Sequence, residues 1–298
     1  MRENNLRIGI DLGGTKIEAL LTDSAGNEIR RARVKTPPNS YSNILESIAD
    51  LLSDLSVPPD LPVGIGMPGS VSPLTGHIRN ANTTSLNGRP FQADLEKNLG
   101  RPVRLANDAN CFTLSESKDG AAKNFSLVFG IILGTGVGGG ISVNSNLIEG
   151  VNAISGEWGH NRMPNLTSRD SERKCYCGRT NCVETWLSGP GLSRTYETIS
   201  KKKLPAEDIV KFFYKGDERA VEAVSRYFDQ LADALSGVIN ILDPDVIVIG
   251  GGLSNIDEIY NEIPGRLERL IFSDYFETKI LKAEHGDSSG VRGASWLW

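Results

Sequence analysis

One histidine and three cysteines lie close together in the middle of the chain. They are His160, Cys175, Cys177 and Cys182, within the segment GHNRMPNLTSRDSERKCYCGRTNCVE. The rest of the sequence holds one further cysteine, Cys111, and two further histidines. Imidazole and thiolate groups gathered in this way are typical metal ligands in a reducing compartment, where disulfides do not form. The segment therefore predicts a metal site.

The composition is typical of a soluble globular protein of one large domain or two ordinary ones. The 298 residues include 39% hydrophobic and 23% charged residues, with a net charge of −5. The N-terminus lacks an apolar segment of signal-peptide type, and no apolar run reaches the ~20 residues that span a bilayer. We therefore expect a cytoplasmic protein with no membrane partner. The acidic charge also argues against a nucleic-acid partner.

Two glycine-rich segments offer backbone N–H groups to an anion. DLGGTK spans Asp11 to Lys16, and GTGVGG spans Gly134 to Gly139. Glycines at this density let the backbone approach a phosphate closely. The second segment also fits the G-x-G-x-x-G pattern of dinucleotide-binding folds, but that fold requires a helix after the glycines, and strand-like alternation follows instead. We therefore expect two phosphate-binding hairpin turns, with Asp11 placed to hold Mg²⁺ through water.

The elements around these glycine segments repeat along the chain. A strand, a glycine turn and a second strand begin near Leu6, and the same outline returns near Leu127. The segments LPVGIGMPGSVS and PDVIVIGGGLSN each lead a buried strand into a glycine turn, and the second contains GGG, which suits close approach by adenosine. Helical periodicity covers residues 41–55 and 217–242. This repetition predicts a duplicated α/β domain.

A carboxylate with catalytic potential follows a predicted strand in the segment RLANDAN. Asn107 and Asp108 lie at the end of that strand, and CFTLSES continues as a helix. A carboxylate in such a place can accept the proton of a substrate hydroxyl, which is the general-base role in phosphoryl transfer. The same position also suits a residue that only caps the helix. The local sequence leaves both interpretations open.

Seven segments together resemble the ROK family of bacterial sugar kinases and sugar-responsive repressors. They are DLGGTK, GMPG, LANDAN, GTGVGGG, GEWGH, CYCGRTNCVE and IGGGLS, and the resemblance continues to the C-terminal HGDSSGVRGASWLW. It implies an actin-like, sugar-kinase (ribonuclease H-like) fold with two similar α/β domains around a cleft. It also implies an N-terminal domain of residues 1–118, completed by a C-terminal helix at 287–298. Residues 119–286 then form a second domain with a zinc-binding loop.

The resemblance also implies roles for individual residues. Asp108 matches the catalytic base. The residues that match ligands of the sugar hydroxyls are Asn107, Asp108, Glu157, His160 and Glu184. Gly13, Gly14, Thr15, Gly134, Thr135 and Gly136 match the ATP phosphate loops, to which we add Asp11, Lys16, Gly250, Gly251 and Gly252 as further nucleotide contacts. The structural zinc ligands match His160, Cys175, Cys177 and Cys182.

Four protein ligands close a tetrahedral zinc site, so the ion is expected to be structural. One imidazole nitrogen of His160 can then bind zinc while the other donates to a sugar hydroxyl. Because the glycine loops lie far away in sequence, we expect the metal to support sugar binding and not ATP binding. The alternative is a zinc knuckle that only fixes a loop.

The expected activity is ATP- and Mg²⁺-dependent phosphorylation of a hexose by a homodimer. The segment from Gly69 to Phe91 and CYCG are most similar to the proteobacterial fructokinase (mannokinase) branch, which favours D-fructose to fructose 6-phosphate, with mannose or glucose as weaker substrates. The patterns IILGTGVGGG and NDANCF keep an N-acetylglucosamine or N-acetylmannosamine kinase as the alternative. A ROK repressor is disfavoured, because repressors carry a helix-turn-helix before the first glycine motif and the first strand is expected at Leu6.

Overall fold

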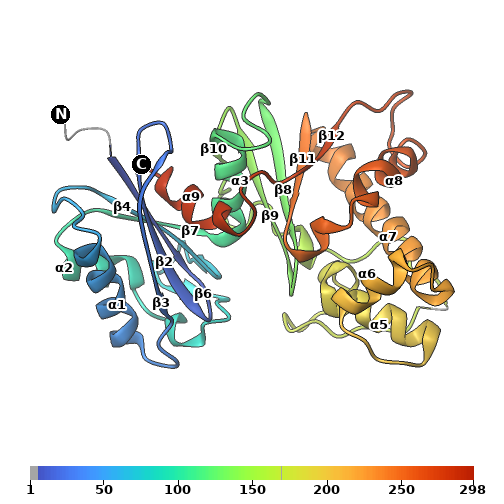
Figure 1. Ribbon diagram of the computed structural model, residues 1–298, viewed down its shortest axis with the longest axis horizontal. Coiled ribbons are helices and arrows are strands. Elements are labelled where there is room, and N and C mark those ends of the chain that lie inside the picture. The colour runs from blue at the N-terminus through green and yellow to red at the C-terminus, as the bar shows by residue number, and fades with distance from the viewer. Residues whose placement is uncertain (1–5, 169) are drawn as a thin grey trace. The chain divides into compact units, whose positions relative to one another are not determined.

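The computed structural model describes residues 6–168 and 170–298, which fold into two compact units (Figure 1). The first unit contains the chain up to Asn124, together with Gly140–Ser155 and His285–Trp298. The second contains Phe125–Gly139 and Gly156–Glu284. The sequence placed the main boundary near residue 118 and assigned residues 140–155 to the second domain, whereas here that segment groups with the first unit.

The first unit is built on a five-stranded sheet with the order β3-β2-β1-β4-β7. Its first three strands are antiparallel, whereas β4 and β7 continue the sheet in parallel with β1. The small hairpin of β5 and β6 and a 3₁₀ turn, η2, follow β4 in the chain. The bounds are β1 (Leu6–Leu12), β2 (Lys16–Asp23), β3 (Glu28–Lys35), β4 (Val63–Met67), β5 (Ser70–Val71), β6 (Ile78–Arg79), η2 (Thr84–Leu86) and β7 (Val103–Asn107).

Helices cover both faces of this sheet: α1 (Tyr41–Asp54) and α2 (Phe91–Leu99) on one, α3 (Asp108–Lys118) and α9 (Ser289–Ser295) on the other (Figure 1). Side chains alternate between the two faces of a strand. The large apolar residues of β1 and β4 therefore join the core with α1 and α2. Glycines face α9, and a Cβ atom on Gly9 or Gly64 would lie 2.2 Å from the Val291 carbonyl oxygen or 1.9 Å from that of Ala294. These glycines allow α9 to lie directly against the strands.

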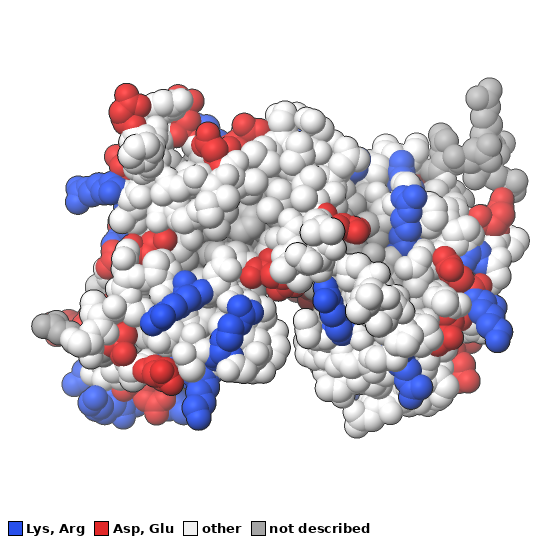
Figure 2. All heavy atoms as spheres, turned by 180° about the vertical axis from the view of Figure 1, so that it is seen from behind, with Lys and Arg blue, Asp and Glu red and all other residues white. Residues whose placement is uncertain are grey.

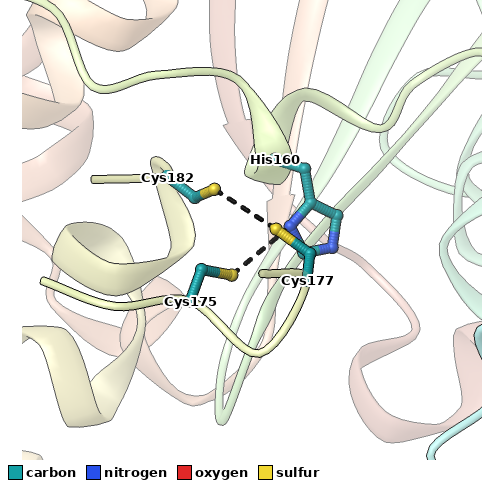
Figure 3. A group of neighbouring side chains, drawn as sticks. All are labelled: His160, Cys175, Cys177 and Cys182. Carbon is teal, nitrogen blue, oxygen red and sulfur yellow. Dashed lines mark hydrogen bonds between the residues drawn. The ribbon is translucent and has the colours of Figure 1, made fainter. Parts of the chain in front are cut away.

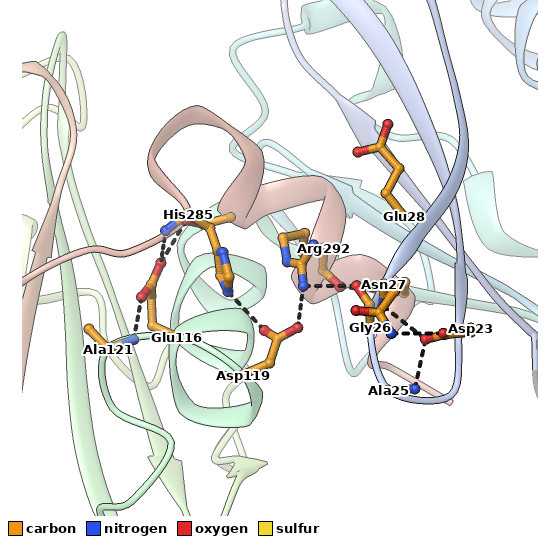
Figure 4. A network of polar contacts seen from close by, with 12 residues as sticks. Asp23, Ala25, Gly26, Asn27, Glu28, Glu116, Asp119, Ala121, His285 and Arg292 are labelled. Carbon is orange, nitrogen blue, oxygen red and sulfur yellow. Dashed lines mark hydrogen bonds and ion pairs between the residues drawn. The ribbon is translucent and has the colours of Figure 1, made fainter.

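Polar contacts hold α9 and the residues before it in the first unit (Figure 4). Asp119, at the end of α3, binds the Arg292 guanidinium and lies 3.0 Å from Nε2 of His285. Arg292 also donates to the carbonyl oxygen of Gly26 at 2.9 Å, in the turn between β2 and β3. The buried Glu116 accepts a hydrogen bond from the His285 N–H at 3.1 Å. The C-terminal segment is thus tied to both α3 and the β2–β3 hairpin.

The second sheet has the order β10-β9-β8-β11-β12. Hairpin-linked strands lie at one side, and β11 is parallel to both β8 and β12. This order repeats that of the first sheet, which confirms the duplicated α/β arrangement predicted from the glycine-strand segments. The bounds are β8 (Leu127–Leu133), β9 (Val137–Val143), β10 (Asn146–Leu147), β11 (Val246–Gly250) and β12 (Lys279–Lys282).

A long helix, α7 (Glu218–Leu242), organises the helical part of the second unit. The Asp217 side chain caps it by accepting from the Ala220 N–H at 3.0 Å. The helix ends before Asp243 and Pro244, as the sequence predicted. Helices α4, α5, α6 and α8 pack against it. The remaining bounds in this unit are η3 (Trp158–His160), α4 (Glu184–Leu187), α5 (Gly189–Ser200), α6 (Ala206–Tyr214), η4 (Gly252–Asn255) and α8 (Glu258–Leu267), whereas η5 (Gly286–Ser288) belongs to the first unit.

The surface carries charges of both signs. Figure 2 shows Lys and Arg side chains interspersed with Asp and Glu side chains on the face in view. Within residues 6–168 and 170–298, no helix combines the length and the apolar character needed to cross a bilayer.

Candidate functional site

Two of the predicted site carboxylates lie at the carboxyl ends of parallel strands in the first sheet. Asp11 is near the carboxyl end of β1, and Asp108 directly follows β7. Strand β4 lies between them, with Gly66 paired to Asp11 and Met67 paired to Asn107. The pKa of Asp11 is raised to about 6, first by burial and then by the negative charges of Asp108 and of a further glutamate. Asp11 and Asp108 therefore interact electrostatically.

The helix cap after β7 is Asn107. Its side-chain oxygen accepts from the Ala109 N–H at 2.9 Å, and its amide nitrogen donates to the Gly69 carbonyl oxygen at 3.1 Å. Asp108 is the first residue of α3, and its Oδ1 accepts from the same Ala109 N–H at 2.8 Å. Asn107 is thus the N-cap residue of α3, and the Asp108 carboxylate shares the same N–H donor, so both roles that the sequence left open for Asp108 stay open. The two bonds of Asn107 use one of the two N–H groups and one of the two oxygen lone pairs of its amide.

The first glycine segment forms the expected hairpin turn. The N–H of Gly13 donates to the Lys16 carbonyl oxygen at 2.9 Å, and the Thr36 hydroxyl donates to the Gly13 carbonyl oxygen at 2.7 Å. The Lys16 ammonium lies 3.3 Å from Oε2 of Glu18, which is buried on β2 and also binds Arg33 at 2.7 Å. Sequence reasoning did not identify Glu18 as a partner of Lys16. Two residues that are two positions apart on a strand share a face, and that spacing alone does not indicate an ion pair.

The second glycine segment is also a hairpin turn. The Gly134 N–H donates to the Gly136 carbonyl oxygen at 3.0 Å, and Thr135 between them is exposed. Strand β9 follows, so the dinucleotide-binding alternative is excluded on the observed structure. The last residue of β11 pairs with Ile132 of β8, which precedes this turn. The turn and the segment Gly250–Gly252 therefore lie at the same end of the second sheet.

The histidine and the three cysteines of the predicted metal site converge (Figure 3). Their ligand atoms all lie within 4.8 Å of one another. Nδ1 of His160 is 3.7 Å from Sγ of Cys175, and Sγ of Cys177 is 3.6 Å from Sγ of Cys182. Tetrahedral zinc with ordinary Zn–S and Zn–N bonds requires ligand atoms about 3.5–3.8 Å apart. The donor set and these two separations therefore fit a closed four-coordinate metal site, and none of the other separations exceeds 4.8 Å.

Short turns deliver these ligands from three backbone segments. His160 ends the η3 turn, and an isolated antiparallel bridge joins Arg162 to Cys182. Cys175 and Cys177 lie on a tight turn closed by a 3.1 Å hydrogen bond from the Gly178 N–H to the Cys175 carbonyl oxygen. Backbone hydrogen bonds of the protein therefore hold the histidine and the three cysteines close together.

The segment that follows the last cysteine contacts the second glycine turn. Oε2 of Glu184 accepts from the Val137 N–H at 3.0 Å, and a Cβ atom on Gly136 would lie 2.7 Å from that oxygen. The Gly189 N–H donates to the Gly134 carbonyl oxygen at 2.8 Å. The segment after Cys182 is therefore close to this turn in space, although the two are far apart in sequence, and the expectation that the metal supports sugar binding and not ATP binding stays a prediction.

Sequence reasoning missed Tyr176, whose only signal is its place between two cysteine ligands. Its hydroxyl lies 3.0 Å from Nε2 of His160. Its pKa is raised to about 12, first by partial desolvation of the hydroxyl, although the residue as a whole is 75% exposed, and then by the negative charges of Glu184, Cys175 and Glu157. Both predicted sugar-binding glutamates therefore act electrostatically on the tyrosine hydroxyl that contacts His160.

Each unit holds one part of the predicted site. The first unit contains Asp11, Gly13, Gly14, Thr15, Lys16, Asn107 and Asp108. The second contains the metal ligands, Glu157, Glu184, Gly134–Gly136 and Gly250–Gly252.

Comparison with known proteins identifies the family. A sequence profile of the ROK family matches residues 7–298. The chain belongs to the ROK family. The N-acetyl-D-glucosamine kinase of Pectobacterium atrosepticum is similar, with 42% identity over 296 residues that cover 97% of each chain. The expectation of a ROK sugar kinase is thus confirmed at the family level.

Solved ROK structures share the fold. The ROK hexokinase of Thermus thermophilus superposes with a TM-score of 0.84 at 27% identity, covering 97% of this chain and 96% of the other. A ROK glucokinase of Streptomyces griseus, solved with glucose and AMPPNP, has a TM-score of 0.78 at 27% identity and covers 98% of each chain. The predicted actin-like, sugar-kinase fold class is confirmed by these neighbours and by the two sheets.

Proposed function

We propose that this protein transfers the γ-phosphate of ATP to a hydroxyl group of a hexose. The observation that carries the proposal is the 42% identity with an N-acetyl-D-glucosamine kinase along almost the whole of both chains. It is supported by the S. griseus relative, which binds glucose and an ATP analogue in the same fold. The two glycine turns and the strand-end carboxylates supply the groups that such a reaction requires.

Asp108 is the proposed general base. Its carboxylate accepts the proton of the sugar hydroxyl as that oxygen forms a bond to the γ-phosphorus and the bond to the β,γ-bridging oxygen breaks, releasing ADP. Glu157, His160 and Glu184 are proposed to hold the other sugar hydroxyls, as the family resemblance implies, and all three belong to the second unit. Such positioning provides much of the rate enhancement in phosphoryl transfer.

Two metal ions are part of the proposal. Asp11 would hold Mg²⁺ through water, where the ion offsets phosphate charge. His160 and the three cysteines would hold one structural Zn²⁺. All four zinc positions are then filled by protein ligands, so the zinc fixes the segment that carries Glu157 and Glu184 and takes no part in the chemistry.

The comparisons favour N-acetyl-D-glucosamine as the sugar over fructose, which was the first expectation from sequence. The similar kinases of Pectobacterium and Yersinia act on N-acetyl-D-glucosamine according to their names and are 41–42% identical to this chain. Fructose stays the second candidate because the segment from Gly69 to Phe91 resembles the fructokinase branch. A pocket that discriminates between the two tenfold needs about 1.4 kcal/mol of differential transition-state binding.

A sugar panel with one active-site variant tests the proposal. ADP release is measured with ATP, Mg²⁺ and N-acetyl-D-glucosamine, fructose, mannose or glucose, for the parent, Asp108→Asn and the exposed-carboxylate control Asp50→Asn. We expect kcat/KM to be highest for N-acetyl-D-glucosamine and kcat of Asp108→Asn to fall by roughly 10²–10⁴ while nucleotide binding and the control stay unchanged.

Three results would contradict parts of this proposal. If no sugar stimulates ADP release, the protein is not a hexose kinase. A kcat of Asp108→Asn within threefold of the parent would mean that Asp108 is not the base. A preference for fructose would return the sugar assignment to the sequence-based expectation and leave the kinase assignment intact.

A further inference from the structure

Tyr176 has a place in the metal cluster that no predicted role explains. It lies between Cys175 and Cys177 on the turn closed by the Gly178 N–H. Its hydroxyl is 3.0 Å from Nε2 of His160, and the two rings meet edge to face with centroids 5.2 Å apart. The side chain is nevertheless 75% exposed. A side chain that exposed can turn away from His160 without opening a hole in the core.

The hydrogen bond to Tyr176 determines which nitrogen of His160 is available to a metal. Nδ1 faces the sulfur of Cys175 at 3.7 Å and must present its lone pair to bind a metal ion there. Nε2 then carries the proton and donates it to the tyrosine oxygen. A partner of this kind on the outer nitrogen of a metal-binding histidine fixes its tautomer and ring orientation.

The same outer nitrogen was expected to donate to a sugar hydroxyl. In the structure the tyrosine hydroxyl has that position instead. His160 is itself one of the residues proposed to hold the sugar, so a hydroxyl 3.0 Å from its Nε2 lies at the proposed sugar site. A phenol hydroxyl and a sugar hydroxyl offer the same acceptor oxygen to an imidazole N–H. Only one of them can take the Nε2 proton at a time.

We propose that Tyr176 is a positioning residue that a sugar hydroxyl replaces. Without sugar, its hydroxyl accepts the Nε2 proton of His160 and holds the imidazole with Nδ1 toward the cysteine sulfurs. On sugar binding the phenol turns outward, and a sugar hydroxyl accepts the same proton. This inference rests on the proposed function, because it names the ligand of that site as the group that displaces Tyr176.

The test compares Tyr176→Phe with the parent protein, both loaded with zinc. This change removes the hydroxyl and keeps the ring. Tyr214→Phe is the matched control, since Tyr214 is another exposed tyrosine of the second unit, and its hydroxyl binds Glu258 at 2.8 Å. Zinc loss to a chromogenic chelator is followed with and without saturating N-acetyl-D-glucosamine or fructose. Sugar affinity is measured by calorimetry.

We expect Tyr176→Phe to lose zinc about tenfold more readily than the parent in the absence of sugar. Saturating sugar should remove this difference, because the sugar hydroxyl replaces the missing acceptor. Sugar should bind the variant about 2- to 10-fold more tightly, since no tyrosine hydrogen bond has to be broken first. Tyr214→Phe should match the parent in each measurement.

Equal zinc retention by the parent and Tyr176→Phe without sugar would overturn the positioning role. Weaker sugar binding by Tyr176→Phe would mean that the tyrosine contacts the sugar directly, which overturns the replacement. If the parent binds neither sugar, the proposed function fails instead. The sugar-free zinc comparison then still tests the hydrogen bond between Tyr176 and His160.

Discussion

A single methyl group on the second glycine turn should disturb sugar binding through Glu184. The Cβ atom of a Gly136→Ala variant would lie 2.7 Å from Oε2 of Glu184, whereas ordinary van der Waals contact begins near 3.4 Å. The carboxylate must therefore retreat by about 0.7 Å, and its 3.0 Å hydrogen bond from the Val137 N–H is lost or stretched. Because a misplacement of about 1 Å in a positioning group can lower rates about 100-fold, kcat/KM for the sugar should fall by roughly 10- to 100-fold.

Gly134→Ala is the matched control for this change. It adds the same methyl group two residues away, at a position where a Cβ atom meets nothing within 4 Å. Calorimetric titration of each variant with sugar and with nucleotide separates the two effects. We expect Gly136→Ala to weaken sugar binding, and Gly134→Ala to leave it unchanged while affecting only the nucleotide. The thermal midpoint of Gly136→Ala should stay close to that of the parent, since only the end of a flexible side chain has to move.

Unaltered sugar affinity and kcat/KM in a folded Gly136→Ala protein would refute this reasoning. Glu184 would then be either free to relocate without consequence or not a sugar ligand. An equal loss of sugar binding in Gly134→Ala would also refute it, because that methyl group does not approach Glu184.

Two further changes test the role of Asp11 in Mg²⁺ binding and the role of the metal ligands. The folded state raises the pKa of Asp11 from 3.8 to about 6, so it binds a proton there more tightly than the unfolded chain does. This proton binding stabilises the folded state at low pH, and the stabilisation is lost as the pH rises through about 6. Because the ionised form is needed to hold Mg²⁺, Mg²⁺–nucleotide affinity measured by calorimetry should fall as the pH drops from 7 to 5, and Asp11→Asn should remove this dependence. Cys177→Ser, which leaves three of the four ligands, should lower sugar affinity about 100-fold. It should also weaken nucleotide binding by a smaller factor, since Glu184 and Gly189 contact the second glycine turn; unchanged nucleotide affinity would show that the turn keeps its conformation without the metal.

Local features of the fold were predictable from the sequence because they depend on neighbouring residues. The cap of α7 at Asp217 and its end before Pro244 follow from side-chain and backbone chemistry within a few residues. The hairpin at Gly134 was distinguished from a dinucleotide-binding turn by the strand-like alternation that follows it. The convergence of the histidine and cysteines was predictable because few other functions gather these residue types in so short a segment.

Sequence reasoning missed contacts between residues that are far apart in the chain, because no local pattern indicates which distant residues meet. Glu184, the first residue of α4, accepts a hydrogen bond from Val137, the first residue of β9, and only the folded structure shows that contact. Asn107 caps α3 while it also donates to Gly69, a bond that depends on the register of β4 beside β7. Sugar specificity is of the same kind, because it depends on the shape of a pocket and not on any one motif.

The seating of α9 on Gly9 and Gly64 has a consequence for the order of folding during translation. The strands of the first sheet leave the ribosome early, but the helix that covers one of their faces begins at Ser289. At ordinary synthesis rates the nascent first unit waits roughly ten seconds or more for that helix. Its uncovered face consists partly of glycine, which presents little apolar surface to other nascent chains during that interval. The first unit is therefore completed only after the second unit has been synthesised.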